Sequence, residues 1–569
     1  MSSKIKGLLR ARGPIKKIGV IGMGYVGIPA AVLFADAPEF DYVYGFQRDS
    51  ITSGYKIDML NSGESPLKGE EPGLDELIKK VTGNAESGGD GESSGKSAGR
   101  RKFECTSDFS RLSECDAITL AIQTPFKSRE DLIPDFTPLI KGLRNAGRYL
   151  TPGTLVVLES TITPGTTEGM AREILEEESG LVAGEDFCLA HAPERVMVGR
   201  LLRNIREHDR IVGGIKSYDA DGRVLDGIDS PNTKRAMELY GPVLTKGKLI
   251  PMSATAAEVT KTAENTFRDL QIAAANQLAL YCEAMGINFY DVRRGVDSLK
   301  GEGITRAMLL PGAGVGGHCL TKDTYHLERG VKIVNEGLKL KFSVGTPDAS
   351  VSTEPFETPD ASVYTEPFET PEPFEPLDPL DFPEGKESLY VLARQINDFM
   401  PHHMFTLTKS ALRRAGKVLE GPENEIKIAL LGWAFLANSD DARDTPAEVY
   451  YKLCKDAGAE VSIHDPHVLS YPGLDEGDNI SHDLDEVIAG ADVIAVLAGH
   501  KEYFSMKPEE ISGTAGVKCP AIVDGRNVID PDMWIDSGFI YKGIGRGDKN
   551  VHRLILSRQH ISKSPEMKS

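Results

Sequence analysis

"KKIGVIGMGYVGIPAAVLFA", residues 16–35, decides the fold of the first part of this chain. Gly22, Gly24 and Gly27 have GxGxxG spacing after an apolar run and before a helical pattern. In such a motif the first glycine permits a tight turn, the second lets the backbone approach a pyrophosphate, and the third lets the helix pack against the strand. Unpaired N–H groups at the helix N-terminus then hold the phosphates. The stretch therefore predicts a dinucleotide-binding strand–turn–helix, the alternative being a glycine turn without a ligand.

Apolar runs alternate with helical patterns outward from this motif. Buried parallel strands are expected at "KKIGVIG", "YVYGF", "DAITLAI", "GTLVVLES" and "DFCLAHAPE". A long helix is expected over about 254–285, with Gly286 as its stop, and a second helix over about 387–415. A second α/β unit begins at "IKIALLGWAF" and continues through "EVSIHDP", "DVIAVLA" and "PAIVDG". The predicted fold class is α/β, with two Rossmann-like doubly wound domains joined by a long central helix.

Two low-complexity insertions interrupt this pattern. Residues 83–101 are rich in glycine and serine and predict a flexible surface loop. Residues 346–375 repeat "TPDASVSTEPFE" as "TPDASVYTEPFE", an acidic, proline-containing period that predicts a disordered or polyproline-like tract, acting as a spacer or as a docking tether. The predicted divisions are a dinucleotide-binding domain over 1–248, the central helix and cysteine loop over 249–340, the acidic tract over 341–385, a connecting helix over 386–420, and a second Rossmann-like domain over 421–569.

Composition excludes several classes of protein. The net charge of −20 argues against a nucleic-acid partner, which selects for a basic face. The N-terminus has no apolar signal region, and no run approaches the roughly 18 apolar residues that cross a bilayer. The 7 cysteines form no CxxC pairs and have no metal-ligand spacing. We expect a cytoplasmic protein without a membrane partner or a metal.

The predicted cofactor site departs from the usual pattern at the second strand. That strand commonly ends in Asp or Glu, which binds the adenosine ribose, but "YVYGFQRDS" has Gln47 there, followed by Arg48. An amide still bonds a ribose hydroxyl, yet it does not repel a 2′-phosphate. NAD is the expected cofactor, with NADP less excluded than usual.

A second stretch, "GAGVGGHCLTKDTYHL" at 312–327, surrounds Cys319 with glycines and places Asp323 four positions later. Because glycine costs backbone entropy, this run suggests close approach by something other than protein side chains. On the predicted long helix, Lys261, Asn265 and Arg268 fall at i, i+4 and i+7, which is either a solvated face or a wall beside a reactive thiol.

Six motifs in order resemble the UDP-glucose/UDP-N-acetylmannosamine 6-dehydrogenase family of nucleotide-sugar dehydrogenases. They are "LNSGESPLKGEEPGL", "LESTITPGTTE", "HAPERVMVG", "KTAENTFRD", "GVGGHCLTKD" and "DDARDTP". The resemblance implies oxidation of a sugar C6 alcohol to a carboxylate with two NAD⁺. Cys319 would capture the aldehyde as a thiohemiacetal, which becomes a thioester and is hydrolysed. The glycines would then let the sugar and the nicotinamide reach one sulfur.

The resemblance also assigns residues. Lys261 would take the alcohol proton or stabilise the oxyanion with Asn265, Asp323 would orient Lys261 or a water, and Glu194, with Thr161, would activate the hydrolytic water. Substrate contacts are expected at Arg195, Val196, Lys261, Asn265, Arg268, Gly316 and Arg526. Cofactor contacts are expected at Gly22, Met23, Gly24, Tyr25, Val26, Gly27, Gln47, Thr124, Thr161 and Arg443. Leu436 stands where the family commonly has a substrate-contacting lysine.

"PERV" and "GGHC" resemble the N-acetylhexosamine branch, which favours UDP-N-acetyl-D-mannosamine, then UDP-N-acetylglucosamine, then UDP-glucose. Two alternatives remain open: a single-step dehydrogenase that needs no thiol, and a non-catalytic nucleotide-sugar sensor. The family resemblance and the apolar "IAAANQLALYCEAMG" on the long helix predict a homodimer or higher homo-oligomer, unless the chain's own domains bury that face.

Overall fold

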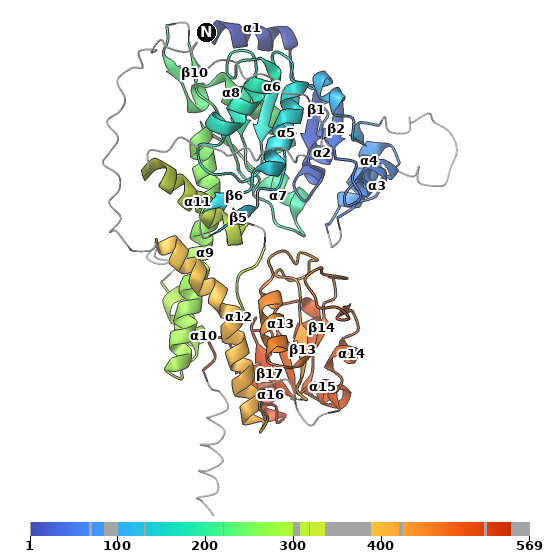
Figure 1. Ribbon diagram of the computed structural model, residues 1–569, viewed down its shortest axis with the longest axis vertical. Coiled ribbons are helices and arrows are strands. Elements are labelled where there is room, and N and C mark those ends of the chain that lie inside the picture. Colours follow the sequence, from blue (N-terminus) through green and yellow to red (C-terminus); the bar gives the residue numbers. More distant parts are fainter. Residues whose placement is uncertain are drawn as a thin grey trace, which may run out of the picture.

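The computed structural model describes residues 2–67, 71–84, 101–129, 132–219, 221–299, 308–317, 319–335, 388–419, 425–516 and 520–547. The predicted repeat at 346–375 and all but the ends of the predicted insertion at 83–101 lie outside these ranges. Figure 1 shows two α/β units, with long helices running from the first unit to the second.

The first unit is built on an eight-stranded sheet in the order β12-β9-β8-β7-β4-β1-β2-β3. Its strands are β1 (Lys17–Ile21), β2 (Tyr42–Phe46), β3 (Phe103–Thr106), β4 (Ala117–Leu120), β7 (Leu155–Leu158), β8 (Cys188–His191), β9 (Arg210–Gly214) and β12 (Leu249–Ser253). Ile18 of β1 is in register with Val43 and with Ala117, so β1 lies between two parallel neighbours. All neighbouring pairs are parallel except β8 and β9, which are antiparallel.

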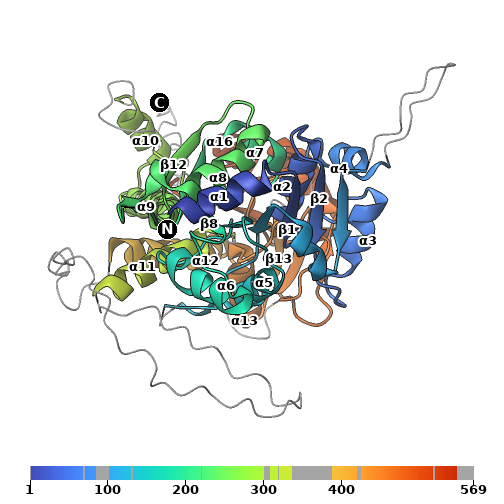
Figure 2. The same ribbon diagram turned by 90° about the horizontal axis from the view of Figure 1, so that it is seen from above.

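Helices cover both faces of this sheet. One core packs α1 (Ser2–Arg12), α2 (Gly27–Asp36), α4 (Leu74–Thr82), α7 (Leu201–Glu207) and α8 (Pro231–Tyr240) on one face. A second core packs α5 (Thr137–Arg148) and α6 (Arg172–Ser179) on the other, as Figure 2 shows from above. The remaining elements of the unit are α3 (Tyr55–Ser62), the hairpin β5 (Phe126–Ser128) and β6 (Ile133–Pro134), and the hairpin β10 (Ser217–Tyr218) and β11 (Val224–Leu225). The sheet is therefore doubly wound.

The connection between the units is a pair of long helices, α9 (Ala254–Ala284) and α12 (Leu389–Arg414), which pack against each other. Ser253 caps α9 by accepting a hydrogen bond from Ala256 N at 3.2 Å, and Gly286 follows its end with φ +69°. Two shorter helices, α10 (Phe289–Asp297) and α11 (Leu320–Asn335), contact α9.

The second unit is a six-stranded parallel sheet in the order β15-β14-β13-β16-β17-β18. Its strands are β13 (Lys427–Leu431), β14 (Glu460–His464), β15 (Ile480–Ser481), β16 (Val493–Val496), β17 (Ala521–Asp524) and β18 (Tyr541–Gly543). One core joins it to α9, α12 and α13 (Pro446–Asp456), and another to α14 (Leu484–Ile488), α15 (Pro508–Ala515) and α16 (Pro531–Asp536).

The predicted α/β class, with two Rossmann-like units and a central helix, is confirmed. Every strand expected from the sequence is present, and the predicted long helix differs from α9 by one residue at its end. The short outer strands β3, β12, β15 and β18, together with β9, were not expected. The predicted division points stay predictions. Among the described residues, no helix combines the length and the apolar character needed to cross a membrane.

Candidate active site

The glycine turn after β1 has the geometry that each glycine was expected to supply. Gly22 has φ +101°, and a Cβ there would lie 2.5 Å from the Ala121 carbonyl oxygen. A Cβ on Gly27 would collide with the Gly22 carbonyl oxygen, so α2 packs directly on the turn. At Gly24 a Cβ would meet no atom within 4 Å. The turn thus keeps free space at the glycine that approaches the pyrophosphate, and its residues fit a dinucleotide.

Gln47 stabilises this turn through both ends of its amide. Its Oε1 accepts a hydrogen bond from Met23 N at 3.3 Å, and its Nε2 donates to Ser53 Oγ at 2.9 Å. Lys56, which the sequence reasoning missed, donates to the Met23 carbonyl at 2.9 Å, and burial lowers the pKa of its amine. The ribose contact predicted for Gln47 stays a prediction.

The cysteine lies at the start of α11. Cys319 is exposed, and its carbonyl accepts hydrogen bonds from Lys322 N at 3.1 Å and Asp323 N at 2.9 Å. This first turn places the Lys322 and Asp323 side chains in the protein interior, where the exposed fraction of each is 5% or less. The thiol is therefore accessible while the charges behind it are buried.

Asp323 contacts the other polar side chains of this buried cluster. Its Oδ2 accepts a hydrogen bond from Asn265 Nδ2 of α9 at 2.5 Å, and its Oδ1 is 3.0 Å from Lys322 Nζ. Burial alone would raise the pKa of Asp323, but the charges of Lys322 and Lys261 outweigh it and hold the pKa below its ordinary value. The predicted catalytic residues Asn265 and Asp323 are thus in direct contact, and Lys261 is close enough to act on the same carboxylate.

Lys261 is buried on α9. Among the described residues its ammonium group has no hydrogen bond or ion pair. It also acts on His191 at the end of β8: burial lowers the pKa of His191 to about 3, with Lys261 adding to the effect. Arg268, by contrast, is exposed. The sequence pattern places these three residues on one helical face, but their exposure differs. Lys261 is buried, Asn265 is half-buried and Arg268 is exposed to solvent.

Thr124 and Thr161 join the same region from the ends of β4 and β7. Thr124 Oγ1 donates to the Thr161 carbonyl at 2.6 Å and lies 3.4 Å from Lys322 Nζ. His326 of α11 bonds Thr163 Oγ1 at 3.0 Å and the Thr124 carbonyl at 3.3 Å. These contacts fasten α11 to the carboxyl edge of the first sheet, where ligands bind in open α/β folds.

The interpretation of the glycines before Cys319 was wrong. A Cβ on Gly316 would lie 2.5 Å from Phe435 Cβ, and one on Gly317, whose φ is +92°, would lie 2.7 Å from the Phe435 ring. At Gly314 it would meet Pro446 at 3.0 Å, and at Gly312 it would meet Arg526 Nη1 at 2.8 Å. At each of these glycines, protein side chains occupy the space that a Cβ would need. The loop that leads to Cys319 is therefore closely packed against residues of the second unit.

Glu194, Arg195 and Val196 form a separate group after β8. Glu194 is buried and ion-paired with Arg210 of β9. Arg195 forms an ion pair with Glu264 of α9 at 2.7 Å. Glu264 directly precedes Asn265 in the sequence. Val196 packs against the core beneath the sheet. The ion pair between Arg195 and Glu264 therefore connects this group to α9, the helix that carries Lys261.

The second unit contributes Arg443 and Arg526. Arg443 pairs with Asp441 at 2.6 Å, and its guanidinium lies 4.9 Å from the centre of the Tyr25 ring in the glycine turn. Tyr25 also donates a hydrogen bond to Asp440 at 3.2 Å. Arg526 donates to the Leu497 carbonyl at 2.7 Å, and burial lowers its pKa to about 10. Arg443 thus lies at the expected cofactor turn, and Arg526 lies at the entrance of the cysteine loop.

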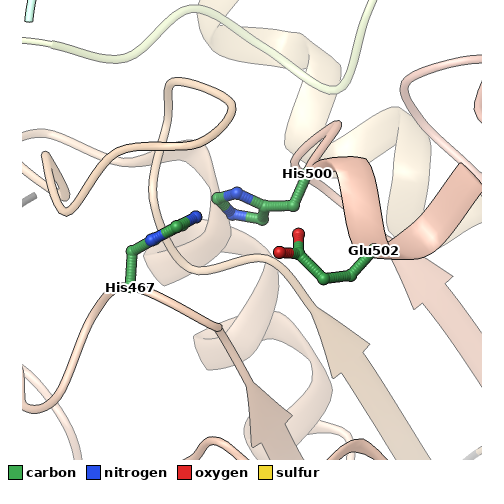
Figure 3. A group of neighbouring side chains, drawn as sticks. All are labelled: His467, His500 and Glu502. Atoms are coloured by element: carbon green, nitrogen blue, oxygen red, sulfur yellow. The ribbon is translucent and has the colours of Figure 1, made fainter. Parts of the chain in front are cut away.

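A second polar cluster, His467, His500 and Glu502, lies at the carboxyl edge of the second sheet, where the three side chains converge (Figure 3). His500 Nδ1 accepts a hydrogen bond from Asn438 N at 2.9 Å, so the ring proton is on Nε2, which is 3.2 Å from Asp465 Oδ2. That tautomer leaves His500 without a lone pair for an ion. The cluster therefore fixes the Asn438 loop and lacks the third ligand that a metal site needs.

Lys322 and Arg210 are the main residues that the sequence reasoning missed. The "TKD" spacing offered a signal for Lys322, because a lysine beside the predicted Asp323 is placed to pair with it. No comparable signal marks Arg210, since it reaches Glu194 only through the pairing of β8 with β9.

Profiles of the UDP-glucose/GDP-mannose dehydrogenase family match three parts of the chain: the NAD binding domain at 16–228, the central domain at 255–344 and the UDP binding domain at 429–531. The UDP-N-acetyl-D-mannosamine dehydrogenase of Pyrococcus horikoshii is 32% identical over 94% of this chain and 100% of its own length. That of Campylobacter jejuni is 30% identical over 87% and 98%. A crystal structure of the NDP-N-acetyl-D-galactosaminuronic acid dehydrogenase from Methanosarcina mazei Go1 is 61% identical, covering 96% of this chain and 99% of its own, with a TM-score of 0.73.

Proposed function

Because the chain belongs to the UDP-glucose/GDP-mannose dehydrogenase family, we propose that it oxidises the C6 hydroxyl of a UDP-N-acetylhexosamine to a carboxylate through a covalent intermediate on Cys319. The observation that carries the covalent step is the exposed thiol at the start of α11, directly ahead of the buried Lys322–Asp323–Asn265 cluster. A single-step dehydrogenase needs no nucleophilic thiol, so that mechanism would leave the position of Cys319 beside the buried cluster unexplained.

The chain is an NAD-dependent oxidoreductase. The open space at Gly24 fits the pyrophosphate, with Met23, Tyr25 and Val26 completing the turn. Thr124 and Arg443 are the proposed contacts nearer the reacting end, and Thr161 the proposed contact from β7. When bound, NAD supplies the hydride acceptor for each oxidation.

Lys261 is the proposed group that takes the proton from the C6 hydroxyl. A buried amine without an ion-pair partner among the described residues is suited to this role, because in its neutral form it has a lone pair to accept the proton and no bound carboxylate competes for it. Asn265 lies one turn further along α9, and its amide donates to Asp323. Asp323 thereby fixes the orientation of Asn265. Lys261 and Asn265 would also stabilise the oxyanion that forms when the Cys319 sulfur adds to the aldehyde.

The final step is hydrolysis of the thioester. A water oxygen attacks the acyl carbon, the carbon–sulfur bond breaks, and Cys319 leaves as the thiolate. Glu194 is the proposed acceptor of the water proton, with Thr161 as its helper. Arg195, Val196, Arg268, Gly316 and Arg526 remain proposed substrate contacts.

UDP-N-acetyl-D-mannosamine is the first candidate substrate, because two relatives at 30% identity or more carry that activity in their names. A galacto-configured UDP-N-acetylhexosamine is the second candidate, because the 61% identical structure is named as an NDP-N-acetyl-D-galactosaminuronic acid dehydrogenase. Mannosamine and galactosamine differ in configuration at C2 and C4, so one pocket is expected to discriminate between them.

A panel of UDP-sugars tests this proposal by the yield of NADH per sugar. We expect two NADH per UDP-N-acetylhexosamine consumed, and a preference for one of the two candidates over UDP-glucose. A yield of one NADH, with the aldehyde as the final product, would contradict the covalent mechanism. Repeating the panel with NADP tests whether Gln47 and Arg48 admit the 2′-phosphate.

We also propose that the protein is a homo-oligomer in the cytoplasm. Part of the apolar face of α9 is covered by the chain itself, since Ala275, Ala279 and Cys282 are buried in the core that α12 shares. Other apolar side chains along these helices remain exposed: Phe267, Tyr281, Met285, Leu389, Leu392 and Phe399. Sedimentation of the wild type and of Phe267→Lys tests whether this face joins two copies.

A further inference from the structure

Arg210 is the cation of a buried cluster that the reaction scheme leaves unused. It lies at the start of β9, and the exposed fraction of its side chain is 5%. Its Nη2 lies 3.0 Å from Glu159 Oε1 and donates to the Ala192 carbonyl at 3.0 Å. Its Nη1 is ion-paired with Glu194. One guanidinium thus bridges two carboxylates at the carboxyl edge of the sheet.

Tyr240 of α8 completes the cluster. Its hydroxyl donates to Glu159 Oε1 at 2.7 Å, and the guanidinium carbon of Arg210 lies 3.7 Å from the centre of its ring. A planar guanidinium stacked on a ring and forked between two acids has little freedom to move. The position of Glu194 is therefore fixed by a rigid, buried support.

The charge balance of this cluster is uneven. The Glu159 and Glu194 carboxylates share the single positive charge of Arg210, so Glu194 does not have this counter-ion to itself. Burial raises the pKa of Glu159, opposed by Arg210 and by the Tyr240 hydroxyl. Glu159 and Glu194 therefore compete for the same guanidinium, so a change at one carboxylate alters how strongly Arg210 holds the other.

A small cavity borders the same carboxylate. It measures about 10 Å³, close to the room that a single water needs, and Glu194, Arg195, His208 and Arg210 line it. Glu194 therefore lies beside a space close to the size of one water, from which a carboxylate can accept a proton.

We propose that Arg210 is the positioning residue of thioester hydrolysis, which holds Glu194 in place, and that Glu159 tunes the strength of this hold from the other side. The proposal rests on the function proposed above. It assigns the cluster to one step only: Arg210 contacts Glu194 and not the Lys261–Asn265–Asp323 group, so both oxidations proceed without it.

The test uses Arg210→Lys in the full chain, with Arg235→Lys as the control. Arg235 has the same exposed fraction of 5% and pairs with Glu238, away from Glu194. We expect Arg210→Lys to release a burst of two NADH per active site and then to turn over at least tenfold more slowly than wild type. The UDP-sugar acyl group should accumulate on Cys319 in intact-mass spectra. Arg235→Lys should show neither effect.

Glu159→Gln gives a second readout that a purely structural role would not move. Without the Glu159 charge, Arg210 binds Glu194 more strongly and makes it a weaker base. The hydrolysis rate should therefore reach half its maximum at a lower pH, and its plateau should fall severalfold, while the burst of NADH is unchanged.

The pH dependence of hydrolysis depends on the charged and titratable groups of this region. Arg195, His208, Asp209 and Arg210 line the cavity beside Glu194. Behind them lie Glu159 (β7) and Tyr240 (α8), which contact Arg210, Glu264 (α9), which pairs with Arg195, and His191 (β8), on which Arg210 and Lys261 (α9) act. Only Glu159 is altered in the variant, and Tyr240→Phe checks the effect of its hydroxyl partner, with less than a twofold change expected.

Three outcomes would overturn the proposal: a folded Arg210→Lys with wild-type turnover, an equal loss of the burst and of turnover, or a Glu159→Gln profile that matches wild type. If Arg210→Lys fails to fold, the Glu159→Gln profile alone decides. Failure of the proposed function looks different, because wild-type enzyme would then give no burst of two NADH with any UDP-N-acetylhexosamine.

Discussion

Asp323 accepts contacts from two directions, and this single carboxylate joins α9 to α11. Asn265 reaches it from one side and Lys322 from the other. The sequence predicted Asp323 and Asn265 as site residues, because they fall in motifs with known order. It did not predict that Lys322 shares the carboxylate, since that contact depends on how the first turn of α11 is buried.

Asp323→Asn should damage both stability and catalysis. The amide leaves Lys322 buried without its counter-ion, so the free energy of unfolding should fall by about 3 kcal/mol. The value of kcat should fall roughly a hundredfold, since Asn265 loses the carboxylate that orients it and Lys261 loses the charge that acts on it. Urea unfolding and steady-state kinetics check both effects. Asp291→Asn, in an exposed pair with Arg294, is the matched control, with no more than about 0.5 kcal/mol expected.

Glu258 makes stability depend on pH. It is fully buried at the start of α9 and accepts hydrogen bonds from Gly165 N at 2.6 Å and Thr167 N at 2.8 Å, yet burial raises its pKa to about 7. A carboxyl whose folded pKa is raised contributes stability below its unfolded pKa and loses it as pH rises through the folded pKa. Between about pH 4.5 and pH 7 the free energy of unfolding should fall by about 3 kcal/mol from this group.

Glu258→Gln isolates that contribution. The variant cannot titrate at this position, so its free energy of unfolding should vary less between pH 4.5 and pH 7 than that of wild type. Denaturant unfolding at several pH values measures the difference. Identical slopes in the two proteins would show that Glu258 is not the titrating group.

At the scale of elements, the loop before Cys319 shows where sequence reasoning stops. Its glycines were recognised as special from the sequence, but the reason assigned to them was wrong. Phe435 and Pro446 are more than a hundred residues away in the chain and approach the loop only when the second unit docks. The helices and strands were predictable because their periodicity is local, whereas this contact is not.

Gly317→Ala tests the loop as a packed element. The residue has φ +92°, and a Cβ would lie 2.7 Å from the Phe435 ring, so both strain and overlap are expected. We expect a loss of about 2 kcal/mol in unfolding free energy and a larger fall in kcat than in affinity for the sugar. Gly295→Ala, in α10 with no atom within 4 Å of a Cβ, should instead raise the unfolding free energy by up to about 1 kcal/mol and leave kcat unchanged. Full recovery by Phe435→Ala would assign the effect to overlap rather than to φ.

At the scale of the whole molecule, the cofactor turn of the first unit contacts the second unit. Tyr25 bonds Asp440, and Arg443 stacks on the same ring. Arg129 of the first unit also pairs with Asp444 of the second at 2.9 Å. The sequence predicted two units and a central helix, but their mutual orientation follows from these long-range contacts.

Tyr25 variants should therefore affect binding of NAD more than binding of the sugar. Tyr25→Ala removes the ring and the hydroxyl, and we expect KM for NAD to rise at least tenfold, while KM for the UDP-sugar changes less than threefold. Tyr25→Phe keeps the ring under Arg443 and should change either value less than threefold, in keeping with the loss of one partly exposed hydrogen bond. Equal changes in both KM values would instead indicate a general loosening of the two units.

The most direct test of the covalent mechanism is the chemical state of Cys319 during turnover. Enzyme quenched with UDP-N-acetylhexosamine and NAD should carry the mass of the UDP-sugar acyl group on the peptide that contains Cys319. Cys319→Ser should lack the adduct and yield fewer than two NADH per sugar. Formation of the acid at the wild-type rate by Cys319→Ser, with no adduct at any time in the wild type, would contradict the mechanism.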